Sequence, residues 1–234
     1  MELLKLLAPT SKILYTMDSM GFFITFEGIE GCGKSTQVRL LDGVLKEGGT
    51  PCLVTREPGG TAIGKKIREI LLNPDNTAMA PEAELLLYAA DRAQHMRELI
   101  KPALDSGNIV VCDRFTDATM AYQGIGRGLD MVLIHELNRI ASLGIRPDLT
   151  LLLDCPAETG IERAFDRNSK NGHARDDRFE REAMAFHKKV RDGYLGIAKA
   201  EPDRVKVVDA TKDIQSMHGE IRGIVDAFLR NNRT

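Results

Sequence analysis

The sequence has almost no excess charge: 32 basic and 34 acidic side chains give a net charge of −2. A protein that coats nucleic acid replaces phosphate counterions with Lys and Arg, so this balance argues against that class, although it allows a local basic pocket for a small anion. Cysteines are also few: there are four, and they form no CxxC pair. This favours reduced thiols in a cytosolic protein over a disulfide framework. No apolar run reaches the roughly 18 residues of a membrane span.

The first twenty residues also lack the features of a signal peptide. Residues 1–20 are mildly apolar, are interrupted by Pro9, and have no basic start followed by a long apolar core. Met17 and Met20 precede the first strand-like run. We therefore expect an N-terminal extension that is disordered or arises from an upstream start site and has no role in the chemistry.

Residues 21–231 alternate short apolar runs with longer segments of helical period, which predicts a single α/β domain with right-handed crossovers. The runs are nearly all-apolar, as in parallel strands covered on both faces. The predicted strands are 22–26, 52–54, 109–112, 149–153 and 205–208. The predicted helices are 34–47, 63–72, 81–100, 129–143, 157–167, 181–199 and 213–228.

One segment interrupts this alternation. Residues 168–177 (NSKNGHARDD) are polar and contain no apolar anchor. Such a stretch between two helices predicts a surface loop, and in an enzyme it is a candidate lid, with bounds of about 166–178.

A glycine-rich motif follows the first predicted strand and opens the first predicted helix. It matches GxxxxGK[ST], in which backbone N–H groups and a helix N-terminus surround phosphate oxygens. Lys34 would reach the β- and γ-phosphates, Ser35 would ligate Mg²⁺, and Thr36 could bond the α-phosphate. The motif predicts binding of a nucleoside triphosphate such as ATP, by Gly28, Ile29, Glu30, Gly31, Cys32, Gly33, Lys34, Ser35 and Thr36.

The strand 109–112 ends in Asp113, the carboxylate expected beside the metal in this kind of site. Arginines are also abundant near strand ends and in loops: Arg56, Arg92, Arg114, Arg163, Arg167, Arg175 and Arg178. Arg56 and Arg114 directly follow strand regions, where open parallel sheets bind ligands. Because Arg holds phosphate bidentately, this pair predicts a second, anionic substrate beside the triphosphate.

Several segments together resemble the thymidylate kinase family of P-loop nucleoside monophosphate kinases, from about Gly21 to Phe228. Beside the phosphate loop, these are Thr55–Thr61 (TREPGGT), Leu87–Arg92 (LYAADR), Asp113–Phe115 (DRF), Ala121–Gly124 (AYQG) and Asp177–Glu180 (DRFE). The resemblance implies a three-layer P-loop kinase fold with a five-stranded parallel sheet and a short lid. It also implies phosphorylation of dTMP to dTDP with ATP and Mg²⁺, and a homodimer.

The resemblance implies roles on the phosphate side. Arg56 would bridge the dTMP phosphate and the phosphoryl group in transfer, with Glu57-Pro58 fixing the turn that aims it. Asp113 would hold Mg²⁺ with Ser35, and Arg114 would grip the acceptor phosphate. The segment Asp209–Thr211 resembles the one near the adenine of ATP.

It implies further roles on the nucleoside side. Glu30 would accept a hydrogen bond from the sugar 3′-hydroxyl, and Tyr122 would crowd the 2′ position and so favour deoxyribose. Tyr88, where the family usually has Phe, would stack on thymine. Arg92 would donate to the base, and Gln123 would help to read its edge.

Two subgroups of this family differ in where the catalytic arginine lies. In one subgroup it directly follows the carboxylate of the loop, but here that residue is Gly31. The chain is therefore similar to the subgroup that supplies cations from the lid, with Arg163, Arg167, Arg175 and Arg178 as candidates.

Two other interpretations remain at this point. One is a kinase for another nucleoside monophosphate or for a deoxynucleoside. The other is a non-catalytic nucleotide-binding module or switch, but the phosphate loop is intact and no guanine-reading NKxD occurs. We interpret the chain as a cytosolic ATP:dTMP phosphotransferase.

Overall fold

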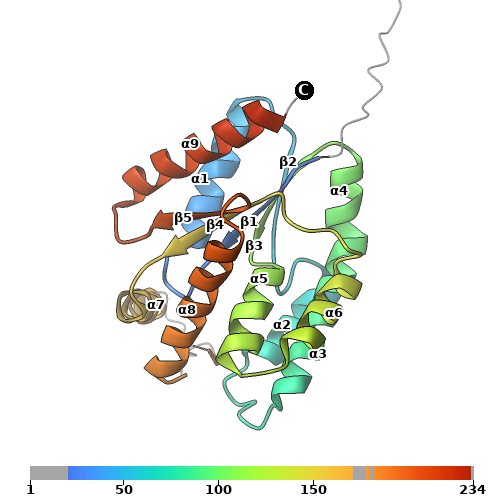
Figure 1. Ribbon diagram of the computed structural model, residues 1–234, viewed down its shortest axis with the longest axis vertical. Helices are drawn as coiled ribbons and strands as arrows, with labels where there is room; N and C mark the ends of the chain where they lie inside the picture. Colours follow the sequence, from blue (N-terminus) through green and yellow to red (C-terminus); the bar gives the residue numbers. More distant parts are fainter. Residues whose placement is uncertain (1–20, 171–177, 180–181, 233–234) are drawn as a thin grey trace, which may run out of the picture.

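Five parallel strands form one sheet in the order β2-β3-β1-β4-β5 in the computed structural model (Figure 1). The structure describes residues 21–170, 178–179 and 182–232, without the side chains of 167–170. The strands are β1 (Phe23–Glu27), β2 (Cys52–Arg56), β3 (Ile109–Asp113), β4 (Leu149–Asp154) and β5 (Val205–Asp209). The five predicted strands and the parallel α/β sheet are confirmed.

Helices connect and cover these strands. They are α1 (Lys34–Glu47), α2 (Ala62–Leu72), α3 (Pro81–His95), the π-helical η1 (Met96–Ile100), α4 (Lys101–Asp105), α5 (Thr116–Thr119), the π-helical η2 (Met120–Gly126), α6 (Met131–Ala141), α7 (Ala157–Lys170), α8 (Met184–Ala200) and α9 (Ile214–Asn232). Within the described residues, no helix combines the length and the apolar character needed to cross a membrane.

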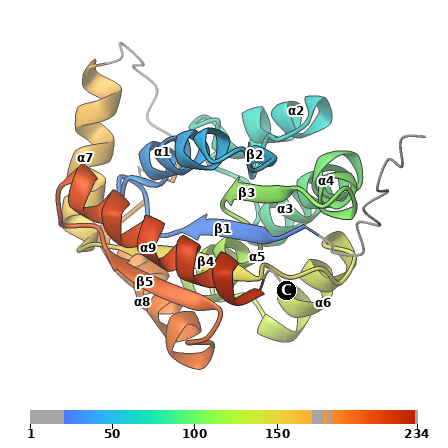
Figure 2. The same ribbon diagram turned by 90° about the horizontal axis from the view of Figure 1, so that it is seen from above.

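The alternation of side chains along β1 separates two helical layers. Ile24 and Phe26 are buried with Val38 and Leu41 of α1. This helix lies beside α9 (Figures 1 and 2). On the opposite face of the strand, Phe23 packs in a second cluster with residues of β3, η1 and α4. Because successive side chains of a strand point to opposite faces, the five-residue β1 supplies both cores.

Two helical regions differ most from the sequence prediction. The helix predicted over 81–100 continues through η1 and α4 to Asp105, and residues 116–126 are helical although no helix was predicted there. The second segment contains β-branched residues and two glycines, which weaken helix propensity. Tertiary packing supports it instead: a Cβ on Gly193 of α8 would lie 3.1 Å from Ile125 Cβ.

The strand register brings the predicted site residues to one edge of the sheet. Phe26 and Arg56 both pair with Asp113, so the segments that follow β1, β2 and β3 start at the same level. The prediction of a loop over 168–177 is wrong at its start, because residues 168–170 belong to helix α7. The rest of that loop, 171–177, and the N-terminal extension, 1–20, lie outside the described residues.

Candidate active site

The loop after β1 has a backbone that only glycine adopts readily. Gly28, Gly31 and Gly33 have φ angles of 133°, 70° and 96°. Side chains disfavour these conformations, so the glycines of the motif are required by the path of the chain. Lys34 then begins α1, as predicted, and the N-terminus of this helix faces the cavity described below.

The ammonium group of Lys34 follows the inside of this loop. It donates to the carbonyl oxygens of Gly28 at 2.9 Å and Ile29 at 2.7 Å, and it lies 3.4 Å from Cys32 Sγ. The cation is 7% exposed. A buried ammonium surrounded by carbonyl oxygens is a ready donor for the oxygens of a bound phosphate.

Ser35 and Asp113 meet across the loop. Ser35 Oγ donates to Asp113 Oδ2 at 2.9 Å, although 78 residues separate them. One hydroxyl and one carboxylate fit Mg²⁺, which prefers oxygen ligands and keeps water and phosphate oxygens in its remaining positions. A denser cage is not needed for this ion, and the described residues contain no group of three or more His, Cys, Asp or Glu side chains that could hold a metal.

Helix α7 lies directly against the phosphate loop. A Cβ on Gly31 would come within 1.8 Å of Gly160 O, and a Cβ on Gly160 would come within 2.5 Å of Glu30 O. Two glycines therefore face each other where the helix meets the loop. This contact brings Arg163 of α7 to the cavity wall, where its Nη1 donates to Ala210 O at 2.8 Å. Ala210 belongs to the segment that the resemblance assigned to the adenine side.

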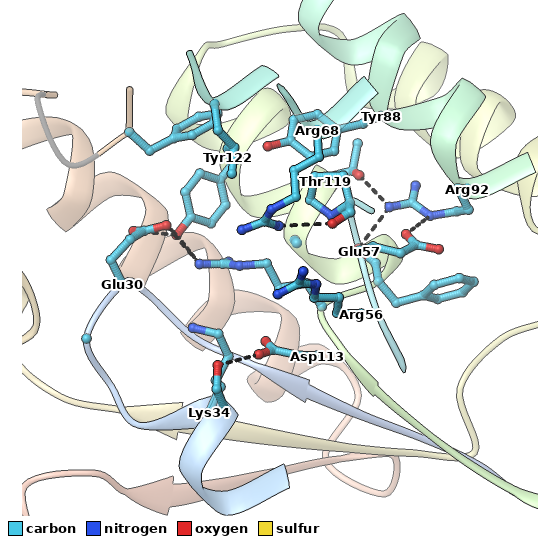
Figure 3. A pocket seen from close by; sticks show the side chains of 18 of the residues that line it. Glu30, Lys34, Arg56, Glu57, Arg68, Tyr88, Arg92, Asp113, Thr119 and Tyr122 are labelled. Atoms are coloured by element: carbon cyan, nitrogen blue, oxygen red, sulfur yellow. Dashed lines mark hydrogen bonds and ion pairs between the residues drawn. The ribbon is translucent and has the colours of Figure 1, made fainter. Parts of the chain in front are cut away.

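Arg56 and Arg114 both line the cavity, as the strand-end argument predicted. Arg56 is the last residue of β2, is exposed, and lies between Lys34 and the aromatic side of the cavity in Figure 3. Arg114 has a φ of 72°, rare for a residue with a side chain. Such strained backbone is concentrated at functional sites.

The guanidinium of Arg114 is held by a polar cluster. Its Nη2 donates to Glu30 at 2.8 Å and to the Tyr122 hydroxyl at 3.1 Å, and its Nη1 donates to the Tyr194 hydroxyl at 3.1 Å. Burial alone would lower the pKa of Arg114, but Tyr122, Tyr194, Glu30 and Glu27 raise it well above its ordinary value. The arginine therefore stays charged in this partly enclosed position.

Glu30 is the anionic partner in this cluster. Both of its oxygens accept from the Tyr122 hydroxyl at 2.7 Å. Burial would raise its pKa, but Arg114, Lys34 and the Tyr122 hydroxyl together bring it below the ordinary value. Glu30 is therefore an ionised acceptor beside the phosphate loop.

The other end of the cavity, which has a volume of about 510 Å³, is aromatic. Phe179 lies between two tyrosines, with ring centroids 6.4 Å from Tyr88 and 5.5 Å from Tyr122. In Figure 3, Tyr88 and Tyr122 lie on the side of the cavity opposite Lys34 and Asp113. A flat apolar ring fits such a wall, while a charged group fits the other end.

Arg92 and Gln123 also line the cavity, but most of their polar atoms have partners in the protein. Arg92 is 1% exposed. It donates to Glu57 from Nε, to Asn138 from Nη1, and to Phe115 O and Thr119 Oγ1 from Nη2. A guanidinium has five N–H donors, so these four bonds leave one donor of Arg92 for a ligand.

The predicted lid arginines separate in the structure. Arg163 lies at the cavity, whereas Arg178 donates to Leu71 O at 3.0 Å and pairs with Glu84. Glu84 is buried and also accepts from Gln123 at 2.8 Å. The side chain of Arg167 and all of Arg175 lie outside the described residues.

Several cavity residues were not predicted from the sequence. Arg68 of α2 lines the cavity and donates to Pro58 O at 2.9 Å, and Thr119 and Phe115 lie around Arg92. Arg68 and Thr119 belong to none of the motifs named from the sequence. Phe115 is the last residue of the DRF motif, but no role was predicted for it. Arg68 also approaches Gly59 closely, since a Cβ added to this glycine would lie 2.8 Å from Arg68 Cδ. This approach depends on how α2 folds back on the turn that follows Arg56.

Comparisons with known proteins agree with this geometry. A family profile described as Thymidylate kinase matches residues 26–221. The chain is 60% identical to a thymidylate kinase of Desulfosudis oleivorans over 90% of this chain and 99% of that protein. It is 55% identical to one of Geotalea uraniireducens, again over 90% of this chain and 99% of that protein. A crystal structure of thymidylate kinase from Ehrlichia chaffeensis is similar, with 35% sequence identity, a TM-score of 0.70, and coverage of 88% of this chain and 99% of that one.

Proposed function

The chain belongs to the thymidylate kinase family, and from this membership and the site we propose how its residues phosphorylate dTMP to dTDP with ATP. One observation carries the proposal. The phosphate loop, with Lys34, and the two strand-end arginines, Arg56 and Arg114, line one cavity. This arrangement suits two phosphate esters that meet end to end.

On the donor side, the loop binds the triphosphate of ATP. Backbone N–H groups from Gly28 to Thr36 surround the phosphates, and Lys34 donates to the β- and γ-phosphate oxygens. When ATP binds, its phosphate oxygens replace the loop carbonyl oxygens as acceptors for Lys34, so the buried ammonium keeps hydrogen-bond partners. Ser35 and Asp113 hold Mg²⁺, which neutralises charge on the phosphates when it is bound.

On the acceptor side, Arg56 and Arg114 bind the phosphate of dTMP. The acceptor oxygen is already anionic, so the transfer needs no strong general base. It needs two negative groups to be brought within bonding distance, and fixed guanidinium charges lower the repulsion between them. Arg56, at the end of the edge strand β2, bridges the acceptor phosphate and the phosphoryl group in transfer.

The nucleoside occupies the aromatic end. Tyr88 stacks on thymine, a type of contact worth about 1–3 kcal/mol per base. The remaining N–H donor of Arg92 and the amide of Gln123 bind the base edge. Glu30 accepts from the 3′-hydroxyl, and the ring of Tyr122 lies against the 2′ position and disfavours ribose.

Additional positive charge for the transition state comes from α7 and the segment after it. Arg163 is the best supported residue because it already lies at the cavity. Arg167 follows it by one helical turn, and Arg175 lies in the predicted lid. Arg178 contributes only if it leaves its ion pair with Glu84.

A substrate panel tests the proposed function. ADP release is measured with dTMP, dUMP, dCMP, AMP, GMP and thymidine side by side, each with ATP and Mg²⁺. We expect dTMP to give the highest kcat/KM. A higher value for another monophosphate or for thymidine would contradict the proposed substrate, and no ADP release with any of them would contradict the proposed reaction.

We also propose that the protein is a cytoplasmic homodimer. Helix α3 packs against α2 and against α6, as the neighbouring ribbons in Figure 1 show. These helices expose large apolar side chains, among which Val132 is 76% exposed and Leu86 and Ile140 are each 56% exposed. Large exposed apolar side chains are frequent at interfaces between subunits. Light scattering of the wild type and of Val132→Asp tests this: the wild type should have twice the monomer mass and the variant should have less.

A further inference from the structure

Three side chains of α3 hold the turn that follows Arg56. Asp91 Oδ1 accepts from the Gly59 N–H at 3.0 Å, and Arg92 Nε donates to Glu57 Oε2 at 2.8 Å. His95, one helical turn further along α3, reaches the same turn. The residues that flank Arg56 are therefore fixed from a single helix face.

The imidazole of His95 contacts both neighbours of Arg56 in the sequence. Its Nδ1 lies 3.0 Å from Glu57 Oε1, and its Nε2 lies 2.7 Å from Thr55 Oγ1. The ring is fully buried. When Nδ1 donates to the carboxylate, Nε2 of the neutral ring accepts from the threonine hydroxyl, so both nitrogens are satisfied.

Gly60 gives independent evidence that the His95 ring has a fixed position in the fold. A Cβ at this position would lie 2.5 Å from His95 Nε2 and 2.9 Å from Thr55 Oγ1. The φ angle of Gly60 is not in the left-handed region, so the backbone alone does not require glycine here. The second glycine of TREPGG is explained instead by the space that the imidazole and the hydroxyl occupy.

Arg56 has backbone support from β3, where it pairs with Asp113 and the adjacent Glu57 N–H donates to Asp113 O at 2.9 Å, but its side chain has none. It ends β2, which is an edge strand with β3 as its neighbour. Among the described residues, no hydrogen bond or ion pair holds its guanidinium, and the side chain is exposed. The direction of the guanidinium therefore follows from the segment 55–57, in which His95 contacts the side chains of both neighbours of Arg56.

We propose that His95 is a positioning residue for phosphoryl transfer, which holds the backbone of Arg56 at the reacting phosphates by bridging Thr55 and Glu57. The proposal rests on the role given above to Arg56. It places no contact between His95 and either substrate. Misplacement of a reacting group by about 1 Å can cost about 100-fold in rate. A residue that contacts neither substrate can therefore control turnover through the position of Arg56.

The test compares His95→Phe, which keeps a ring but removes both nitrogens, with His95→Asn and His95→Gln. Asparagine can replace the Nδ1 donor to Glu57, and glutamine can replace the Nε2 contact with Thr55. We expect His95→Phe to lower kcat about 10- to 100-fold and to change the KM for ATP by less than about twofold. We expect His95→Asn to recover part of the loss. Thr55→Val removes the other end of the bridge and tests the proposal if the histidine variants fail to fold.

Two controls separate positioning from loss of stability. Met96→Ala truncates the next side chain on the helix, which is buried in the hydrophobic cluster with Val110 and Cys112 of β3. This variant should lower the melting temperature and leave kcat near the wild-type value. His95→Phe is also combined with Arg56→Ala. If His95 acts through Arg56, adding His95→Phe to Arg56→Ala should change the residual kcat of Arg56→Ala by less than about twofold.

The outcomes are distinguishable. A wild-type kcat in His95→Phe, or the same loss in the presence and absence of Arg56, would overturn the positioning role. A wild-type kcat in Arg56→Ala would instead overturn the role of Arg56 and the inference with it. Absence of dTMP phosphorylation by the wild type would overturn the function itself.

Discussion

The hydroxyl and the ring of Tyr122 have separable tasks, which the variant Tyr122→Phe isolates. The hydroxyl donates to both oxygens of Glu30 at 2.7 Å and accepts from Arg114 at 3.1 Å. The ring packs edge-on against Phe179 and Phe186, with centroids 5.5 and 6.1 Å away. Phenylalanine keeps the ring contacts and removes only the bond to the charged pair.

The expected loss follows from these bonds. A hydrogen bond to a charged group contributes about 1.5–3 kcal/mol, which corresponds to about a 10- to 150-fold change. Because Glu30 and Arg114 both hold dTMP in the proposed site, we expect kcat/KM for dTMP to fall by an amount in this range. The preference for dTMP over its ribonucleotide counterpart, 5-methyluridine monophosphate, should stay within about twofold of the wild type, because the ring that lies against the 2′ position is retained.

Steady-state kinetics with both nucleotides check this expectation, and Tyr194→Phe is the matched control. Tyr194 also bonds Arg114, at 3.1 Å, but its hydroxyl donates to Glu27 and not to Glu30. Tyr194→Phe should weaken dTMP binding but keep the discrimination against 3′-deoxythymidine monophosphate. Tyr122→Phe should reduce this discrimination. A wild-type kcat/KM in Tyr122→Phe, or a loss of selectivity against the ribonucleotide, would refute the reasoning.

Three further outcomes follow from other parts of the site. Ser35→Ala removes one of the two oxygen donors and should raise the Mg²⁺ concentration for half-maximal activity by about tenfold, which a metal titration at saturating nucleotides measures. Arg163→Ala should lower kcat much more than it changes ATP binding, and equal losses in both would contradict a role in the transition state. Burial and the nearby Asp117 raise the pKa of Glu27 from 4.5 to about 7. Between these pH values the folded protein keeps a proton that the unfolded chain has lost. The contribution of Glu27 to stability therefore falls as the pH rises from about 4.5 to about 7. Melting curves of the wild type and Glu27→Gln should therefore show the wild type losing stability relative to the variant as the pH rises from about 4.5 to about 7, and parallel curves would exclude the effect.

The framework of the fold could be predicted because its signals are local. The run at 22–26 and the motif that ends at Lys34 each lie within a few residues, and parallel strands bring their carboxyl ends together by geometry alone. The meeting of Ser35 and Asp113, which lie 78 residues apart, follows from that rule. The roles given to individual residues toward dTMP remain predictions.

What could not be predicted depends on packing between distant segments. The helix at 116–126 forms against α8, although its own sequence favours helix weakly. The four internal bonds of Arg92 come from residues at 57, 115, 119 and 138, so no spacing along the chain indicates them. The pairing of Arg178 with Glu84 similarly joins residues 94 positions apart.

The contact between Gly31 and Gly160 limits how a kinase of this shape can evolve. A side chain at position 31 would collide with the backbone of α7 at 1.8 Å, and the backbone there is already left-handed. An arginine could enter the loop only if the helix moved outward, which would also withdraw Arg163 from the wall of the cavity. In this chain, a cation placed at position 31 would therefore disturb the contact that positions the cation at 163.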